Sequence, residues 1–263
     1  MLVQYLVVCL TSFTVSALTL FSGFGLGTLL LPVFSIFFPV PVAVAATAVV
    51  HFANNIFKAL AVGDRAHWGI VAQFALPGAA AALLGAGLLT YFAALPPAFA
   101  YMFGLQKVTV SVIDLIIGVL IIGFGLFEIL PKLQRLSFDP RWLPVGGLLS
   151  GFFGGLSGNQ GALRAAFLIK TGLSKDAFIA TSVMSALVVD AARLMVYGTA
   201  YMTTRFAAIP ASGVPLLFSA ILSSLLGVIL AARHMNKVTL PTIRYLVGGL
   251  LLIVGLGLIS GLI

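Results

Sequence analysis

The feature that constrains this chain most is a succession of apolar runs, most of them long enough to cross a bilayer as a helix of about 20 residues. Of its 263 residues, 61% are hydrophobic and 8% are charged, whereas soluble domains contain about a quarter charged residues. So few charges cannot cover a water-facing surface, and lipid must therefore be the main solvent. No polar stretch is long enough for a separate soluble domain, which argues against an extramembrane enzyme.

Charged residues, prolines and glycines divide the chain into ten apolar segments. They run near 3–21, 26–38, 42–62, 68–92, 108–130, 142–157, 162–171, 176–198, 213–233 and 243–262. The second and the seventh segments are short. The sequence therefore predicts an all-α, polytopic transmembrane helical bundle with about eight full spans plus half-helices.

The basic residues sort to one side when these segments are laid alternately through a membrane. One side receives nine of the 14 Lys and Arg residues, and the other receives Lys107 and Arg205. By the positive-inside rule the richer side is cytoplasmic, with both termini outside. We expect a multi-pass protein of a bacterial or archaeal cytoplasmic membrane. The nine residues are Arg65, Lys132, Arg135, Arg141, Lys170, Lys175, Arg233, Lys237 and Arg244.

The net charge of +8 is spread over short loops and forms no basic run, so the lipid bilayer rather than nucleic acid is the expected partner. Cys9 is the only cysteine, which excludes an internal disulfide and a thiolate metal cluster. No metal site and no cofactor is predicted. The N-terminus lacks a positive region ahead of its long apolar run, and we interpret that run as a retained first helix.

The two halves of the chain, 1–131 and 132–263, resemble each other and form one integral membrane domain. Each half contains five segments, an odd number, so the halves would enter the membrane from opposite faces. An inverted repeat of this kind is a common plan of secondary transporters. Chance similarity among Ala- and Gly-rich helices is the alternative. The matching positions are Gly27 with Gly161, Ala46-Thr47-Ala48-Val49 with Ala180-Thr181-Ser182-Val183, Asn55 with Asp190, Lys58 with Arg193, and Gly63 with Gly198.

In each half a helix runs into a glycine-rich break, and a short helix follows. At about 1.5 Å per residue, the short helix of the second half covers about 15 Å, which places its break near mid-membrane. The first turn of such a helix has unpaired N–H groups and a partial positive charge, and glycines let an anion approach them. Alternatively, the glycines serve close helix packing. The breaks are Ser22-Gly23-Phe24-Gly25-Leu26-Gly27 and Ser157-Gly158-Asn159-Gln160-Gly161.

At these residues the sequence resembles the TauE/SafE family, whose members are linked to export or uptake of sulfite, organosulfonates and related sulfur anions. Each half of the family pattern opens with a glycine-rich stretch, continues through a nearby proline and reaches an Ala-Thr-Ser-like stretch. In this chain the first half has Gly23 to Gly27, Pro32 and Ala46-Thr47-Ala48. The second half has Gly158 to Gly161 and Ala180-Thr181-Ser182, but Asn159 and Gln160 interrupt its glycines and no proline follows.

Arg164 lies in the first turn of the second short helix, three residues after Gly161. The helix dipole and the guanidinium would there reinforce each other toward an anion. Asn159 and Gln160 could supply further donors. The predicted substrate-binding residues are Gly23, Gly25, Gly27, Thr47, Asn159, Gln160, Gly161, Arg164 and Thr181.

Polar residues inside membrane segments usually face a cavity or a partner. Segment 42–62 carries a polar stripe at helical spacing, and segment 176–198 carries a sparser one. Alternatively, the side chains of Lys58 and Arg193 could extend to the lipid headgroups, and Asp190 can form an ion pair with Arg193 one turn away. His51 could either titrate in a proton-coupled cycle or stay neutral between helices. The predicted gating or coupling residues are His51, Asn54, Asn55, Lys58, Asp190 and Arg193.

The sequence thus predicts a secondary transporter that moves a small anion by alternating access, and the resemblance implies a sulfur oxyanion. A proton or sodium ion for coupling and a second copy in a homodimer are further candidate partners. An anion channel and a cation carrier are the alternatives. An intramembrane serine hydrolase is a weaker alternative. The stretch Gly155-Leu156-Ser157-Gly158 resembles the turn that carries the nucleophile of a serine protease, but no histidine lies nearby in the sequence to act as the base.

Overall fold

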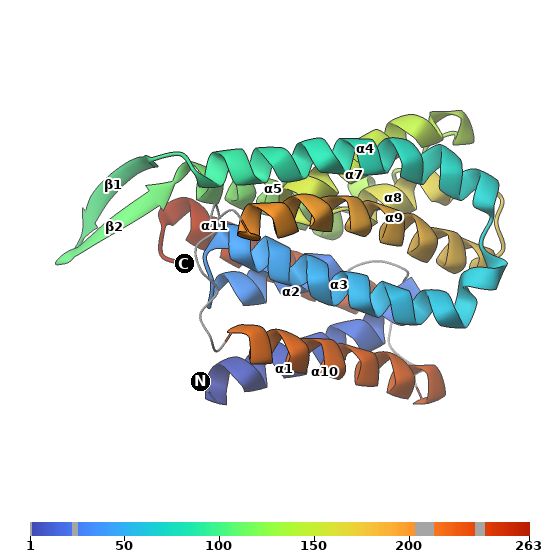
Figure 1. Cartoon of the computed structure of the whole chain (residues 1–263), viewed down its shortest axis with the longest axis horizontal. Coiled ribbons are helices and arrows are strands. Elements are labelled where there is room, and N and C mark those ends of the chain that lie inside the picture. The colour runs from blue at the N-terminus through green and yellow to red at the C-terminus, as the bar shows by residue number, and fades with distance from the viewer. Residues whose placement is uncertain (1, 23–25, 203–212, 235–239) are drawn as a thin grey trace.

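The computed structural model describes residues 2–22, 26–202, 213–234 and 240–263, and it is a helical bundle with one small hairpin at its end (Figure 1). In the first half the long elements are α1 Leu2–Ser22, α2 Leu26–Ser35, α3 Val40–Val62, α4 Trp68–Ala93 and α5 Val112–Ile129. In the second half they are α7 Leu143–Ser157, α8 Gly161–Leu168, α9 Lys175–Met202, α10 Gly213–His234 and α11 Leu240–Ser260. Short turns of helix, η1 Gly63–Arg65, α6 Pro131–Gln134 and η2 Pro140–Trp142, join some of them.

The polytopic all-α prediction is confirmed, but the number of full spans was overestimated. Among the described residues, six helices are long and apolar enough to cross a membrane, namely α1, α3, α4, α5, α9 and α10. The expected count of about eight included α7 and α11. However, α7 has only 15 residues, and the described apolar part of α11 is the shorter stretch Val247–Ser260.

The helices of one half pack mainly against helices of the other. α1 packs against α10, α7 against α4, α5 against α11, and α3 against α9. Figure 1 shows the α1–α10 pair and the α4–α7 pair on opposite sides of α3 and α9. In the predicted inverted repeat, α1 corresponds to α7 and α10 to α4, so these two pairs would be equivalent. The pairing is what such a repeat would produce, and the repeat itself stays a prediction.

Glycines bring α7 and α4 into direct backbone contact. A Cβ atom added at Gly147, Gly151 or Gly155 would lie only 2.0, 1.9 or 2.2 Å from a carbonyl oxygen of α4. These glycines recur every fourth residue and therefore form one ridge along α7, the arrangement that lets membrane helices approach closely. This ridge fixes α7 against α4, and its glycines are not those of the break, for which close packing was the alternative interpretation.

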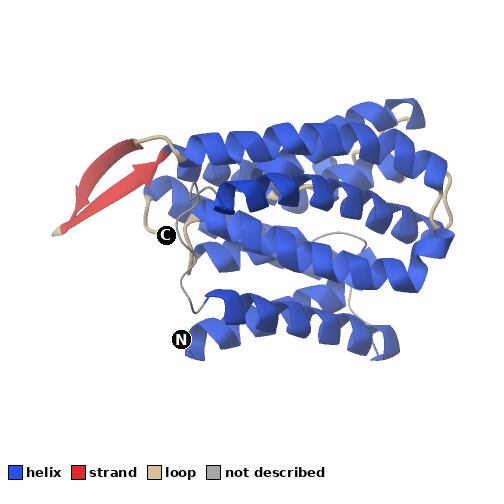
Figure 2. Ribbon diagram, in the orientation of Figure 1, coloured by secondary structure: helices blue, strands red, loops and turns tan. Residues whose placement is uncertain are grey.

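A β-hairpin between α4 and α5 was not expected from the sequence. Strands β1 Pro97–Phe103 and β2 Gln106–Ser111 pair antiparallel, with Phe103 opposite Gln106 at the turn. Gly104, at φ 62°, adopts the left-handed conformation that such a tight turn needs. Figure 2 shows the hairpin projecting from the end of the bundle beyond the helices.

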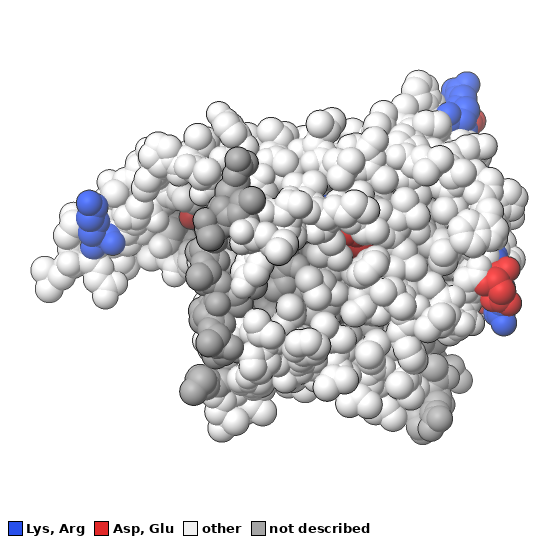
Figure 3. All heavy atoms as spheres, in the orientation of Figure 1, with Lys and Arg blue, Asp and Glu red and all other residues white. Residues whose placement is uncertain are grey.

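Charged side chains gather at the two ends of the molecule. Figure 3 shows Lys and Arg at both ends of this face, with a nearly uncharged surface between them. The exposed pair Arg65 and Asp176 joins η1 to the start of α9 at 2.8 Å. Figure 1 shows both ends of the chain at the opposite end of the molecule, with the C-terminus near the base of the hairpin. An uncharged girdle between two charged ends is the surface that a membrane protein presents to lipid.

Candidate functional site

The candidate site begins at the break between α7 and α8. α7 ends at Gly158, whose φ of 79° is left-handed, a conformation that glycine adopts without the steric penalty of a side chain. The N–H of Gly158 donates to the carbonyl of Gly154 at 3.0 Å, which closes the last turn. α8 then begins at Gly161 after the buried residues Asn159 and Gln160. The break predicted at these positions is present.

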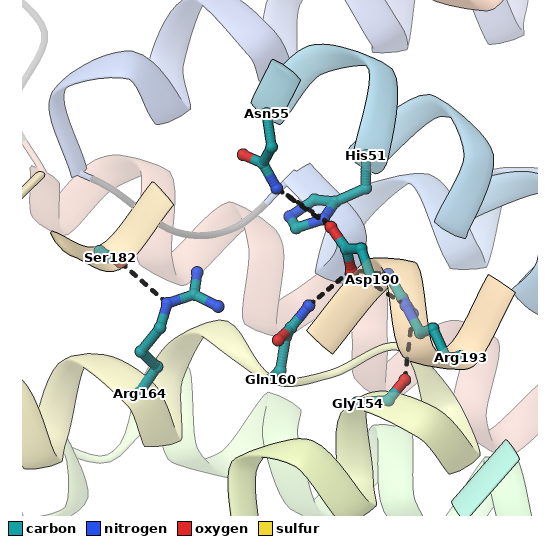
Figure 4. A network of polar contacts seen from close by, with 8 residues as sticks. All are labelled: His51, Asn55, Gly154, Gln160, Arg164, Ser182, Asp190 and Arg193. Atoms are coloured by element: carbon teal, nitrogen blue, oxygen red, sulfur yellow. Dashed lines mark hydrogen bonds and ion pairs between the residues drawn. The ribbon is translucent and has the colours of Figure 1, made fainter. Parts of the chain in front are cut away.

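A fully buried carboxylate, Asp190 on α9, organises the polar groups around this break (Figure 4). Its Oδ1 accepts from Gln160 Nε2 at 2.8 Å and from Arg193 Nε and Nη2 at 3.0 and 2.7 Å. Its Oδ2 accepts from Asn55 Nδ2 at 3.1 Å and lies 2.6 Å from His51 Nδ1. Asp190 therefore joins α3 of the first half to α9 and to the break of the second half.

Arg193 is also fully buried, and its charge is neutralised by Asp190. Its Nη1 donates to the carbonyl of Gly154 at 3.0 Å, and the hydroxyl of Tyr197, one turn along α9, donates to the carbonyl of Gly155. The last carbonyls of a helix lack partners within the helix and carry a partial negative charge. Arg193 and Tyr197 thus hold the end of α7 in place, and Arg193 has little capacity left for a substrate.

Arg164 is bound quite differently. It is 2% exposed, and its Nε donates to the hydroxyl of Ser182 on α9 at 2.8 Å. Its Nη1 is buried and has no hydrogen-bond partner among the described residues, and no carboxylate in the described ranges forms an ion pair with it. A buried cation with an unused donor is costly unless something anionic pairs with it.

Other buried polar atoms near the break also lack partners within the part of the chain that the structure describes. They are Gln160 Oε1, Asn159 Oδ1 and the hydroxyls of Thr47 on α3 and Ser185 on α9. Figure 4 shows the guanidinium of Arg164 and the amide of Gln160 pointing into the same space, below Asn55 and His51. Buried polar groups are normally satisfied. The two hydroxyls can donate to a ligand with several oxygen atoms, whereas the two amide oxygens can only accept.

The polar stripe expected on α3 is divided between two neighbours. His51 and Asn55 face Asp190 on α9. Asn54 instead donates to the hydroxyl of Ser16 on α1 at 3.2 Å, and Lys58 Nζ lies 3.5 Å from the hydroxyl of Thr19 on α1. The residues of the stripe are all buried, and at spacings of three and four they diverge enough to contact two different helices.

Lys58 is a second buried cation that has no acidic partner among the described residues. It is 7% exposed, and the group that its ammonium contacts is a neutral hydroxyl. The charge of Arg164 acts on it, so the two cations belong to one electrostatic environment although they come from different halves of the chain. Because Asp190 already balances Arg193, Arg164 and Lys58 are the two buried basic side chains without an ion pair among the described residues.

The remaining predicted residues are placed as follows. Thr181 accepts a hydrogen bond from the backbone N–H of His67 at 2.9 Å, so its hydroxyl fixes the start of α4 rather than joining Arg164. Gly161 is buried at the first position of α8. Gly27 lies in the first turn of α2, and Gly23 and Gly25 lie outside the described residues.

Sequence reasoning assigned no role to Ser182 or Tyr197. Ser182 belongs to the Ala180-Thr181-Ser182 stretch, but its contact with Arg164 depends on how α8 packs against α9. Tyr197 follows Arg193 by one helical turn, and that spacing was the available signal.

A pocket at the end of the bundle that carries the hairpin is separate from these residues. It has a volume of about 520 Å³ and lies between the α2–α3 turn, α5 and the end of α11. Asp114 lines it, and none of the described Lys and Arg residues does. An anion would find no positive side chain of the described chain there, so the buried cations mark the better candidate site.

Comparison with known proteins gives one match. The model of a family described as sulfite exporter TauE/SafE matches residues 8–258. No curated protein and no solved structure matches the chain.

Proposed function

Because the chain belongs to the TauE/SafE sulfite exporter family, a family of sulfur-anion transporters, we propose that it carries sulfite, an organosulfonate or a related small sulfur oxyanion across the membrane by alternating access. In this proposal the protein is a multi-pass protein of a bacterial or archaeal cytoplasmic membrane, with both termini outside and its basic loops inside.

The observation that carries the proposal is the buried guanidinium of Arg164, whose Nη1 has no partner among the described residues. An oxyanion beside it would accept from Nη1 and neutralise the charge, and a guanidinium suits oxyanions because its donors diverge in one plane. Arg164 also lies in the first turn of α8, where the helix dipole favours negative charge. The hydroxyls of Thr47 and Ser185, which are buried without partners among the described residues, could donate further hydrogen bonds. The amide nitrogens of Asn159 and Gln160 already donate to Ser157 and Asp190.

The arrangement of the two halves supports alternating access. The Asp190 network connects α3 with α9 and with the α7–α8 break, so a movement between the halves would act directly on the residues around the anion. Lys58 lies four residues before the end of α3, on the side with the basic loops, where it would line the inner access route. Rocking of repeats around a central site is a common mechanism of secondary transporters.

The same contacts argue against a cation carrier and against a serine hydrolase. A cation carrier needs a carboxylate with free oxygen lone pairs, whereas both oxygens of Asp190 already accept from side chains of the protein. A serine hydrolase needs a base on its nucleophile. Ser157 instead donates to the carbonyl of Phe153 at 3.0 Å, and the contacts of the His51 ring within the described residues are to Asp190 and Asn55 rather than to Ser157.

Counterflow in proteoliposomes tests the proposal. Vesicles loaded with unlabelled sulfite should accumulate radiolabelled sulfite against its gradient, and sulfonates should compete while sodium and potassium should not. A carrier shows saturable counterflow, which a channel does not. Equal uptake without counterflow would identify a channel, and uptake of cations alone would overturn the anion assignment.

A further inference from the structure

We propose that His51 is a proton-binding site and that the protein moves a proton together with its anion. The inference rests on the proposed function, because it assigns a coupling ion to the same transport cycle. It starts from the hydrogen bonds of the imidazole, which leave one ring nitrogen engaged and the other free to take a proton.

Nδ1 of His51 is the ring nitrogen that contacts the Asp190 carboxylate. It lies 2.6 Å from Oδ2 of Asp190, and Asp190 is held as a carboxylate because Arg193 and Gln160 direct three N–H groups at its other oxygen. A carboxylate only accepts hydrogen bonds, so Nδ1 carries the hydrogen and donates it. Asn55 Nδ2, 3.1 Å from the same oxygen, likewise donates to Asp190.

Nε2 of His51 is the ring nitrogen that can take up a proton. With the hydrogen on Nδ1, Nε2 of the neutral ring has a free lone pair. Both contacts of the ring in the described part of the chain are made by Nδ1, and the side chain retains 9% exposure. A proton can therefore add to Nε2 without breaking any of the contacts around Asp190. Only an N–H bond forms on loading, and only that bond breaks on release.

The charged side chains around the imidazole ring connect proton binding with anion binding. Protonation would place a positive charge beside Asp190, which favours it, and within the influence of Arg193 and Arg164, which oppose it. An anion bound at Arg164 would remove the part of that opposition that comes from Arg164. By linkage, each ligand then strengthens the binding of the other by the same factor. Mutual stabilisation in one bound state favours movement of proton and anion in the same direction.

The other elements packed against α3 bring few ionisable groups to His51. α2, α4 and the described side chains of α10 contain no Asp, Glu, Lys, Arg or His. Lys58 lies two turns along α3 itself and faces α1. The remaining groups lie at the ends of neighbouring elements and are Asp64 and Arg65 on η1 and Asp114 and Glu128 on α5.

The experiment separates proton coupling from anion transport by comparing exchange with gradient-driven uptake. In His51→Asn the amide nitrogen takes the position of Nδ1 and can still donate to Asp190, but the side chain cannot be protonated. His51→Gln is the second variant, to be used if His51→Asn misfolds. His67→Asn is the matched control, because His67 is an exposed histidine that caps α4 through Ile70 N, and asparagine is a good helix cap. A sulfonate serves as the probe, since its charge does not change near neutral pH.

In proteoliposomes, wild type and His67→Asn should accumulate the sulfonate when a pH gradient is imposed. The solution from which the sulfonate enters is set to about pH 6 and the interior of the vesicles to about pH 8. His51→Asn should exchange it at a rate independent of pH and should not accumulate it. In detergent, wild type should take up about one proton per anion bound at neutral pH, measured with an indicator dye, and the His51 variants should take up none.

Accumulation by His51→Asn equal to that of wild type would overturn the inference, and so would anion binding by wild type without proton uptake. Proton release on anion binding would also overturn it, because the two ligands would then compete. If wild type neither binds nor exchanges any sulfur anion, the proposed function itself fails. If wild type exchanges the anion but does not accumulate it in response to the pH gradient, proton coupling is contradicted and the proposed function is not.

Discussion

Arg193 donates from Nε and Nη2 to the same oxygen of Asp190, at 3.0 and 2.7 Å, and neither side chain is exposed. The two residues lie one helical turn apart on α9, so this pair forms within one element, and its outer contacts then reach α3 and α7. A buried pair of this kind neutralises itself, which leaves the charge of Arg164 for another partner.

Breaking this pair should destabilise the protein strongly. Removal of one member leaves the other as an uncompensated buried charge, which costs about 3–5 kcal/mol. Asp190→Asn and Arg193→Gln should each lower the unfolding temperature in detergent, and the double variant should lose less than the sum of the two. The exposed pair Arg65 and Asp176 is the control, because Arg65→Ala should change stability by at most about 1 kcal/mol. Additive losses at Asp190 and Arg193 would show that they do not interact.

The glycine ridge of α7 should tolerate no larger residue. A Cβ at Gly151 would lie 1.9 Å from the carbonyl oxygen of Gly78, so Gly151→Ala must push α7 away from α4. Overpacking of this kind costs about 1–3 kcal/mol. Gly87→Ala on α4 is the matched control, since nothing lies within 4 Å of a Cβ there. Thermal unfolding of the two variants compares them, and equal stability would mean that α4 and α7 are not in backbone contact.

Local sequence signals predicted the break between α7 and α8 and the ion pair of α9. Glycine at position 158 ends a helix by its conformation, and residues 190 and 193 meet through helical spacing alone. These features depend on a few neighbouring residues. The prediction needed no knowledge of how the helices pack.

The contacts between helices could not be predicted in the same way. Thr181 and Ser182 are adjacent, yet one contacts His67 and the other contacts Arg164, and only the packing of α9 decides which. The hairpin was missed because its strands are short and lie between long apolar runs. The expected count of spans exceeds the six found among the described residues partly because segment 142–157 was counted as a full span although it is short for one.

The orientation can be checked by labelling single cysteines. With Cys9 replaced by Ala, cysteines at Lys132 and Lys170 should react with an impermeant reagent only from the cytoplasm, because the positive-inside rule places them there. A cysteine at Lys107 on the hairpin should react only from outside. All three positions are exposed. Labelling of positions 107 and 132 from the same side would contradict the predicted orientation.

Lys58 should affect transport more than binding. Its ammonium contacts Thr19 on α1 rather than the Asp190 network, in keeping with a place on the access route. Lys58→Gln should therefore slow counterflow several-fold while changing the equilibrium affinity for sulfite little. Parallel measurements of counterflow rate and affinity decide this. A loss of affinity as large as the loss of rate would place Lys58 in direct contact with the anion.

The most direct test of the central claim is the affinity of an Arg164→Ala protein for sulfite, measured by calorimetry on purified protein that elutes as a folded species. Loss of a charged hydrogen bond should weaken binding by about 1.5–3 kcal/mol, which is about ten- to a hundred-fold in Kd. Arg141→Ala, at an exposed arginine, should bind as wild type does. Wild-type affinity in a folded Arg164→Ala protein would contradict a direct contact between Arg164 and the anion.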